Sequence, residues 1–131
     1  MLWRAAEEGY KVVVKKLLET DKVDVNLMDS DERTPLSLAT LNGREAVVKL
    51  LLDTGKVEVN LMDGDGWTPV SRAALNGHEA VVKILLDTGK ADVDLKDGDG
   101  CTLVSRAALN GHEAAVNILL DRNIVSVELD D

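Results

Sequence analysis

The sequence predicts an all-α repeat solenoid, in which helix-turn-helix units are joined by turn or hairpin loops. The first observation is self-similarity: residues 63–96 align without gaps on residues 97–130, with 23 of 34 positions identical. Residues 29–62 align on residues 63–96 with 22 of 34 identical, where chance gives roughly two or three. The second observation is that each unit carries helix start and stop signals. The third is a composition with 2% aromatic residues, so that a core of Ala, Val, Leu and Ile is required.

The period of 34 divides the chain into repeats of one domain that spans residues 1–131. Leu2 aligns with Leu36, so the first repeat lacks its opening segment. The predicted units are an incomplete repeat at 1–28 and full repeats at 29–62, 63–96 and 97–131.

The second repeat shows how each unit is built. Thr34 followed by Pro35 is a helix start, because the hydroxyl can accept an orphan amide and proline fits the first helical position. The first helix is predicted over Pro35–Leu41, and Asn42-Gly43 ends it.

A second helix is predicted over Glu45–Asp53, closed by Gly55. Its wide apolar stripe must be covered on more than one side. Residues 56–60 are predicted to be extended, and residues 63–66 turn the chain into the next unit. Helices this short are not stable alone, so neighbouring repeats must stack to bury a continuous core.

These motifs resemble the ankyrin repeat, and within that family they are most similar to the long arrays of fungal proteins. The resemblance covers essentially the whole chain. It is carried by Thr34-Pro35-Leu36-Ser37-Leu38-Ala39, Asn42-Gly43, Val47-Val48-Lys49-Leu50-Leu51-Leu52, Val59-Asn60 and Gly77-His78-Glu79-Ala80-Val81-Val82.

The chain departs from the family pattern at a few positions. The period is one residue longer than the usual 33. Serine stands at Ser37, Ser71 and Ser105 where the family usually has a histidine that braces the turn. Leu103 replaces the proline, and Glu32 replaces the turn glycine that is kept as Gly66 and Gly100. The resemblance therefore implies local differences in rigidity within an unchanged fold.

Charge and composition exclude several function classes. The formal net charge is -9, which repels phosphate backbones and anionic membrane surfaces, so we expect no nucleic-acid or membrane binding. No window approaches the roughly 18 apolar residues of a transmembrane helix. The one cysteine, Cys101, cannot form an internal disulfide. We expect a monomer in the cytoplasm, with the nucleus as an alternative.

Motifs that suggest metal or acid-base chemistry have simpler explanations. The repeated Asp-Gly-Asp-Gly that begins at Asp63 suggests a calcium-binding loop, which needs a glutamate at its twelfth position. That position is Ala74 if Asp63 is the first residue of the loop, and Arg72 if Asp63 is the third. His78 and His112 occupy a position that Arg44 and Tyr10 fill elsewhere, so a structural role is favoured. No base is placed beside Ser71 or Ser105. The sequence therefore predicts no catalytic residues, no cofactor and no metal.

Residues that recur on the outer side of the first helices and on the turn tips predict a binding surface. In ankyrin repeats the first helices and the turn tips line the concave face, which is the usual binding surface. Three different residues, Arg33, Trp67 and Cys101, share one tip position, which suggests freedom from folding constraint. Trp67 is expected to be exposed. Leu38, Arg72 and Arg106 occupy one equivalent position on the first helices, and all three are expected to be exposed. The predicted partner-binding residues are Arg33, Trp67, Arg72, Arg106, Leu41, Leu75, Leu109, Asp65 and Asp99.

The sequence favours a non-catalytic protein-interaction module that binds an unidentified protein partner on its concave face. Free arginines would give this interaction a salt dependence and imply an acidic partner surface. An alternative role for Leu41, Leu75 and Leu109 is packing between neighbouring repeats instead of partner binding. Two alternatives for the function are an enzyme or small-ligand carrier that uses a groove in the stack, and a structural spacer in a larger array. A deep pocket with perturbed titratable groups would favour the enzyme or carrier.

Overall fold

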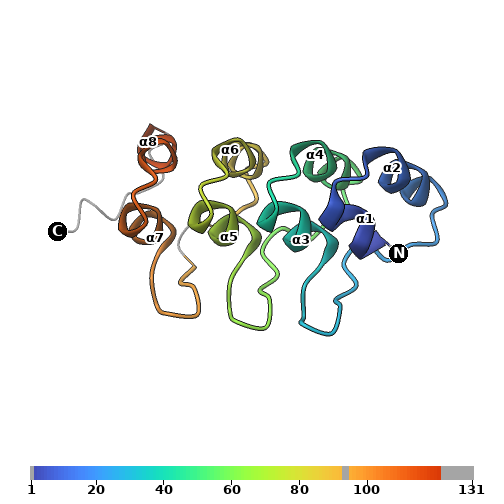
Figure 1. Cartoon of the computed structure of the whole chain (residues 1–131), viewed down its shortest axis with the longest axis horizontal. Coiled ribbons are helices and arrows are strands. Elements are labelled where there is room, and N and C mark those ends of the chain that lie inside the picture. The colour runs from blue at the N-terminus through green and yellow to red at the C-terminus, as the bar shows by residue number, and fades with distance from the viewer. Residues whose placement is uncertain (1, 93–94, 122–131) are drawn as a thin grey trace.

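The computed structural model describes residues 2–92 and 95–121, and over these residues it contains four helix pairs in a row (Figure 1). The first helices of the pairs form one layer and the second helices form another, with long loops projecting to one side beyond the first layer. The helices are α1 (Leu2–Glu8), α2 (Lys11–Glu19), α3 (Pro35–Leu41), α4 (Glu45–Asp53), α5 (Pro69–Leu75), α6 (Glu79–Asp87), α7 (Leu103–Leu109) and α8 (Glu113–Asp121). The predicted bounds of α3 and α4, and the all-α repeat fold, are confirmed.

Threonine caps begin α3, α5 and α7. The Oγ1 atom of Thr34 accepts a hydrogen bond from the Ser37 amide at 3.1 Å, and the same bond recurs in the next two repeats. In α5 the side chains of Thr68 and Ser71 also hydrogen-bond to each other at 2.8 Å. In α7 the side chains of Thr102 and Ser105 make the same bond at 3.1 Å, so serine at the family's histidine position braces the start of these two helices.

The core lies between the helix pairs and continues from one repeat to the next. Leu51 and Leu85 in the second helices have 0% and 1% of their surface exposed. Val47 in α4 is 1% exposed, whereas its counterpart Val13 in α2 is 38% exposed, because no preceding helix pair covers α2 in the described structure. Burial of the second helices thus depends on their neighbours, as expected for a stacked repeat.

The connectors between repeats are less extended than the sequence predicts. The described residues contain no β-strand, and the chain turns at Val59–Asn60. Val59 is buried while Val57 is half-buried. Part of the prediction for residues 56–60 is therefore wrong: the backbone turns there, so that asparagine can bond to the next repeat.

Candidate functional site

The tips of the hairpin loops are each organised by one aspartate. In the third repeat, the Asp63 amide donates to the Trp67 carbonyl at 2.9 Å. Its Oδ1 accepts the amides of Asp65 at 2.9 Å and Trp67 at 3.1 Å. Asp29 and Asp97 make the same bonds in their repeats. The Asp-Gly-Asp-Gly motif thus uses its first carboxylate to close the loop.

An arginine from the following helix completes the carboxylate cluster in the third and fourth repeats. Arg72 Nε lies 2.7 Å from Asp63 Oδ2, and its Nη2 lies 3.1 Å from Asp65 Oδ2. Arg106 pairs in the same way with Asp97 and Asp99, at 3.0 Å in both cases. Both arginine side chains are 15% exposed, so the structure binds them into the fold.

The indole ring of Trp67 packs against both of these arginines. The Cζ atom of Arg72 is 4.9 Å from the centre of the indole ring, and that of Arg106 is 4.8 Å from it. Because one arginine belongs to the same repeat and the other to the next, the indole is enclosed and only 7% exposed. The prediction of an exposed tryptophan is wrong. So is the expectation for Leu38, which is 3% exposed at the position equivalent to Arg72.

The pKa values of Asp63 and Asp97 reflect this environment. Burial raises the pKa of each carboxyl, but the hydrogen bonds from the paired arginine and from two backbone amides outweigh it. The net pKa of each carboxyl therefore lies below its ordinary value. These carboxyl groups are anions that hold arginines in place.

The three predicted leucines differ in exposure along the stack. Leu41 and Leu75 are half-buried, whereas Leu109 is 70% exposed. The first two have a following repeat beside them, because Asn76 and His78 reach the Leu41 carbonyl. This gradient favours packing between neighbouring repeats as the main role of Leu41 and Leu75.

The remaining predicted residues lie on the loop tips. Asp65 and Asp99 have side chains that are 75% and 68% exposed, although each also pairs with an arginine. Arg33 and Cys101 are half-buried at the position that Trp67 occupies in the third repeat. The structure therefore gathers the tip residues along one edge of the stack (Figure 1).

Both histidines bind backbone in the preceding repeat. His78 Nε2 lies 3.0 Å from the Leu41 carbonyl oxygen, and His112 Nε2 lies 2.8 Å from that of Leu75. A carbonyl can only accept, so Nε2 carries the proton. Arg44 makes the equivalent bond to the Glu7 carbonyl at 3.0 Å. This geometry agrees with the structural role favoured from the sequence.

Asp63 and Asp97, which position the arginines, are not among the binding residues predicted from the sequence. A signal was present: the third and fourth repeats pair an aspartate with an arginine nine residues later, whereas the second has Asp29 with Leu38. In the described ranges, no group of three His, Cys, Asp or Glu side chains is arranged to hold a metal ion.

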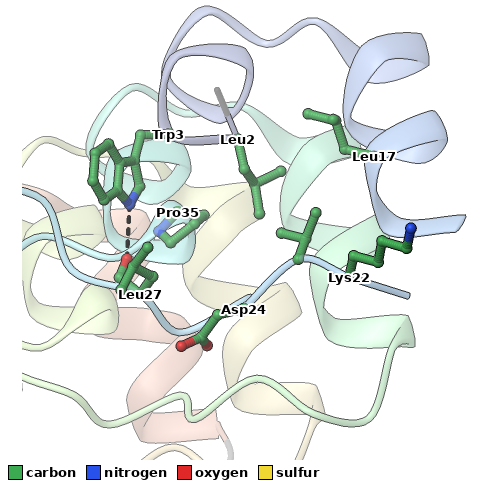
Figure 2. Close-up of a pocket in the computed structure, with 8 residues that line it drawn as sticks. Leu2, Trp3, Leu17, Lys22, Asp24, Leu27 and Pro35 are labelled. Atoms are coloured by element: carbon green, nitrogen blue, oxygen red, sulfur yellow. Dashed lines mark hydrogen bonds between the residues drawn. The ribbon is translucent and has the colours of Figure 1, made fainter. Parts of the chain in front are cut away.

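Two hollows are relevant to binding. One, of about 320 Å³, is polar and lies between the loop tips of the second and third repeats; it is lined by Ser30, Asp31, Glu32, Arg33, Gly64 and Asp65. The other, of about 260 Å³, is mostly apolar and lies beside the first repeat (Figure 2).

The helix pairs, stacked core and looped connectors define a helical repeat solenoid. The family pattern described as ankyrin repeats in three copies matches residues 2–97 and 55–131, so the chain belongs to the ankyrin-repeat family. No curated protein matches the chain. None of the helices in the described ranges has the length and apolar character needed to cross a membrane.

Proposed function

We propose that the chain is a non-catalytic protein-interaction module whose concave face, made by the first helices and the loop tips, holds one protein partner. The family supports this role, since ankyrin repeats generally mediate protein-protein interaction. The pKa shifts resolved among the described residues, at Asp63, Asp97 and Arg106, all belong to the ion pairs at the loop tips. The ion pairs account for these pKa shifts, so the shifts do not favour an enzyme as the alternative function.

The observation that carries the proposal is the ordered cluster of Arg72, Trp67 and Arg106. Its ion pairs and ring contacts fix neighbouring loop tips relative to each other. A surface that is already ordered loses little conformational entropy when it binds. The predicted residues then have two different roles. Trp67, Arg72 and Arg106 keep the surface ordered, whereas Asp65, Asp99 and Arg33 contact the partner.

The charge of the loop tips argues against the acidic partner surface that the sequence suggested. Arg72 and Arg106 are neutralised by carboxylates, so neither offers a free cation to an acidic surface. The tips and paired arginines together carry seven carboxylates against three guanidinium groups, an excess of four negative charges. These groups are Asp29, Asp31, Glu32, Asp63, Asp65, Asp97 and Asp99, with Arg33, Arg72 and Arg106. We therefore expect a partner that presents lysine, arginine or amide donors.

A random-peptide display selection against the folded chain tests this function before any natural partner is identified. Binders should be enriched in Lys and Arg. The variant Asp65→Asn with Asp99→Asn should weaken them by about tenfold or more, as expected when charge complementarity is removed. Raising the salt concentration should weaken binding further.

The matched control places the same number of changes on the second helices. Lys49 and Lys83 are exposed at equivalent positions of α4 and α6, and Lys49→Ala with Lys83→Ala should leave binding unchanged. Loss of binding in this control, with retention in the aspartate variant, would contradict the concave face as the site. A single cysteine, which cannot form an internal disulfide, supports a cytoplasmic or nuclear location. We also propose that the chain works as a monomer.

A further inference from the structure

Met28 and Met62 are exposed apolar residues at one equivalent position of neighbouring loops. They lie three residues before Asp31 and Asp65, the exposed aspartates at the tips of the same loops. Met28 is 36% exposed and Met62 is 39% exposed. Met62 lies in a loop with a neighbour on both sides, whereas Met28 lies in the outermost loop of the described structure. The equal exposure is therefore a property of the loop itself and does not depend on the end of the stack.

The loop tips of the second, third and fourth repeats are in contact with one another. The Gly64 amide donates a hydrogen bond to the Asp31 carbonyl at 3.3 Å. A Cβ atom at Gly98 would collide with the Asp65 carbonyl oxygen, so the third and fourth tips also touch. The three loops hang side by side from the layer of first helices (Figure 1). Their spacing is therefore fixed by direct contact.

The interval between the loops follows from the helices that they lead into. The tip aspartates Asp31, Asp65 and Asp99 each stand four residues before α3, α5 and α7, respectively. α3 packs against α5, and α5 packs against α7. Because packed helices lie about 8–10 Å apart, the aspartates form a row at about this interval, and the two methionines recur at the same interval.

A partner segment can use both sets of residues only if its own side chains recur at the interval of the loops. Side chains on one face of a β-strand recur about every 7 Å. One turn of an α-helix covers about 5.4 Å and two turns cover about 10.8 Å. Three residues of a polyproline II helix make one turn and rise about 9 Å, so every third residue falls within the interval. Polyproline II is therefore the regular conformation that fits the loops best.

We propose that the partner binds these loops through a polyproline II segment in which a basic residue followed by an apolar residue recurs at every third position. The basic residues pair with Asp31, Asp65 and Asp99, and the apolar residues cover Met28 and Met62. This inference rests on the proposed function and adds to it the spacing and the amphipathic character of the partner.

The charge and chemistry of the loops support this occupant. The tips carry an excess of negative charge, and Asp65 and Asp99 are 75% and 68% exposed despite their arginine partners, so their carboxylates can accept further donors. Methionine is flexible and polarisable, and it adapts to different apolar side chains. Lys96 stands at the methionine position of the fourth repeat, so the apolar contact is confined to two loops.

Three synthetic peptides test the spacing and the amphipathic character separately. The first is Lys-Leu-Pro-Lys-Leu-Pro-Lys-Leu-Pro, in which each proline favours polyproline II geometry at the preceding leucine. The second, Lys-Leu-Lys-Leu-Lys-Leu-Pro-Pro-Pro, has the same composition with lysine at every second position. The third replaces each leucine of the first with serine. Fluorescence anisotropy of labelled peptides on the full chain should show that the first binds about tenfold or more tightly than either of the others.

The ε-methyl NMR signals of methionine locate the contact. The chain has three methionines, and Met28→Gln and Met62→Gln assign two of the signals. Both signals should shift saturably with the first peptide. The double variant should bind the first peptide about tenfold more weakly and the serine peptide unchanged, because glutamine keeps the length of the side chain but is polar.

A matched control changes two exposed apolar residues on the second helices. Val12 in α2 is 64% exposed and Leu120 in α8 is 50% exposed. Val12→Gln with Leu120→Gln should leave the affinity for the first peptide unchanged. An equal loss of affinity in this control would overturn the methionines as the apolar contact.

The remaining outcomes separate this inference from the proposed function. Equal affinities of the first two peptides would overturn the spacing, and an unchanged affinity in the methionine variant would overturn the apolar contact. If binding were then still lost in Asp65→Asn with Asp99→Asn, the concave-face function would stand without the inference. Failure of all three peptides to bind at millimolar concentration would contradict both.

Discussion

Trp67 shows how a side chain on a loop tip can become part of the core. Its indole ring is apolar, yet it packs against two guanidinium groups whose charges are balanced by Asp63 and Asp97. A cation over an aromatic ring contributes about 0.5–2 kcal/mol, depending on how far the pair is desolvated. Here the two contacts join the third repeat to the fourth, so the tryptophan stabilises their interface.

Replacement of Trp67 by alanine should therefore be costly. We expect Trp67→Ala to lower the free energy of unfolding by about 3 kcal/mol, the range found when a buried aromatic side chain is truncated. Urea unfolding followed by circular dichroism measures this. The control is Arg33→Ala at the equivalent half-buried position, which should change stability by less than about 1 kcal/mol. Equal effects of the two variants would show that the arginine stack does not stabilise the fold.

Glu32 adopts a backbone conformation that glycine adopts elsewhere. Its φ is 62°, where Gly66 and Gly100 at the equivalent positions have φ of 84° and 82°. A non-glycine residue in this region is strained by roughly 1 kcal/mol. The departure from the family pattern at this position therefore has a local energetic consequence.

We expect Glu32→Gly to raise the free energy of unfolding by about 0.5–1 kcal/mol, because the left-handed conformation no longer has a steric penalty. Thermal and urea unfolding measure the change. Glu32→Ala is the matched control, since it removes the same carboxylate but keeps the Cβ atom. A gain with alanine as large as that with glycine would assign the effect to charge.

At the scale of elements, the residue just before α4, α6 and α8 ties its helix pair to the preceding one. Arg44, His78 and His112 all reach a backbone carbonyl at the end of the preceding first helix. Gly43 leaves room for this contact: a Cβ at this position would lie 2.8 Å from Nδ1 of His78. The contact made by His78 therefore requires a glycine at position 43 of the preceding repeat.

This tie can be tested by exchanging its residues. His78→Ala should lower the free energy of unfolding by about 1 kcal/mol, since Asn76 still donates to the Leu41 carbonyl at 3.1 Å. His78→Arg should restore most of the loss, because Arg44 makes the equivalent bond in the second repeat. Denaturant unfolding measures both variants. Equal loss in the two would indicate that ring packing, rather than the hydrogen bond, is responsible.

The sequence predicted the elements well because their signals are local. The bounds of α3 and α4 follow from Thr34-Pro35, Asn42-Gly43 and Gly55, all within a few residues of the helix ends. The environment of Trp67 was not predictable in this way, since Arg106 lies 39 residues further along the chain. Variation at one repeat position therefore does not show freedom from folding constraint, since Trp67 at that position packs against Arg72 and Arg106.

At the scale of the whole molecule, two buried aspartates paired with arginine make stability depend on acidity. The pKa values of Asp63 and Asp97 are lower in the folded protein than in an unfolded chain. Their contribution is thus fully present above the unfolded pKa of about 4 and is lost as the pH falls through the lower folded values.

We expect the free energy of unfolding to decline below about pH 4, and to decline less in Asp63→Asn with Asp97→Asn. That double variant should also be less stable at pH 7, because Arg72 and Arg106 each lose a charged partner. Urea unfolding at several pH values gives both quantities. The exposed Asp53→Asn should leave the pH dependence unaltered. A double variant with the original acid dependence would assign it to other carboxylates.

Stability of the stack as a whole should follow from contacts between neighbours. Deletion of residues 97–131 removes Arg106, which packs over the Trp67 ring, together with α7 and α8, which pack against α5 and α6. In a solenoid each repeat is stabilised mainly by its adjoining repeats, so the loss should be several kcal/mol and exceed that of Trp67→Ala. Urea unfolding should show an earlier midpoint, and Trp67 fluorescence should become accessible to acrylamide. An unchanged midpoint would mean that the remaining repeats fold independently of the fourth, which contradicts a nearest-neighbour stack.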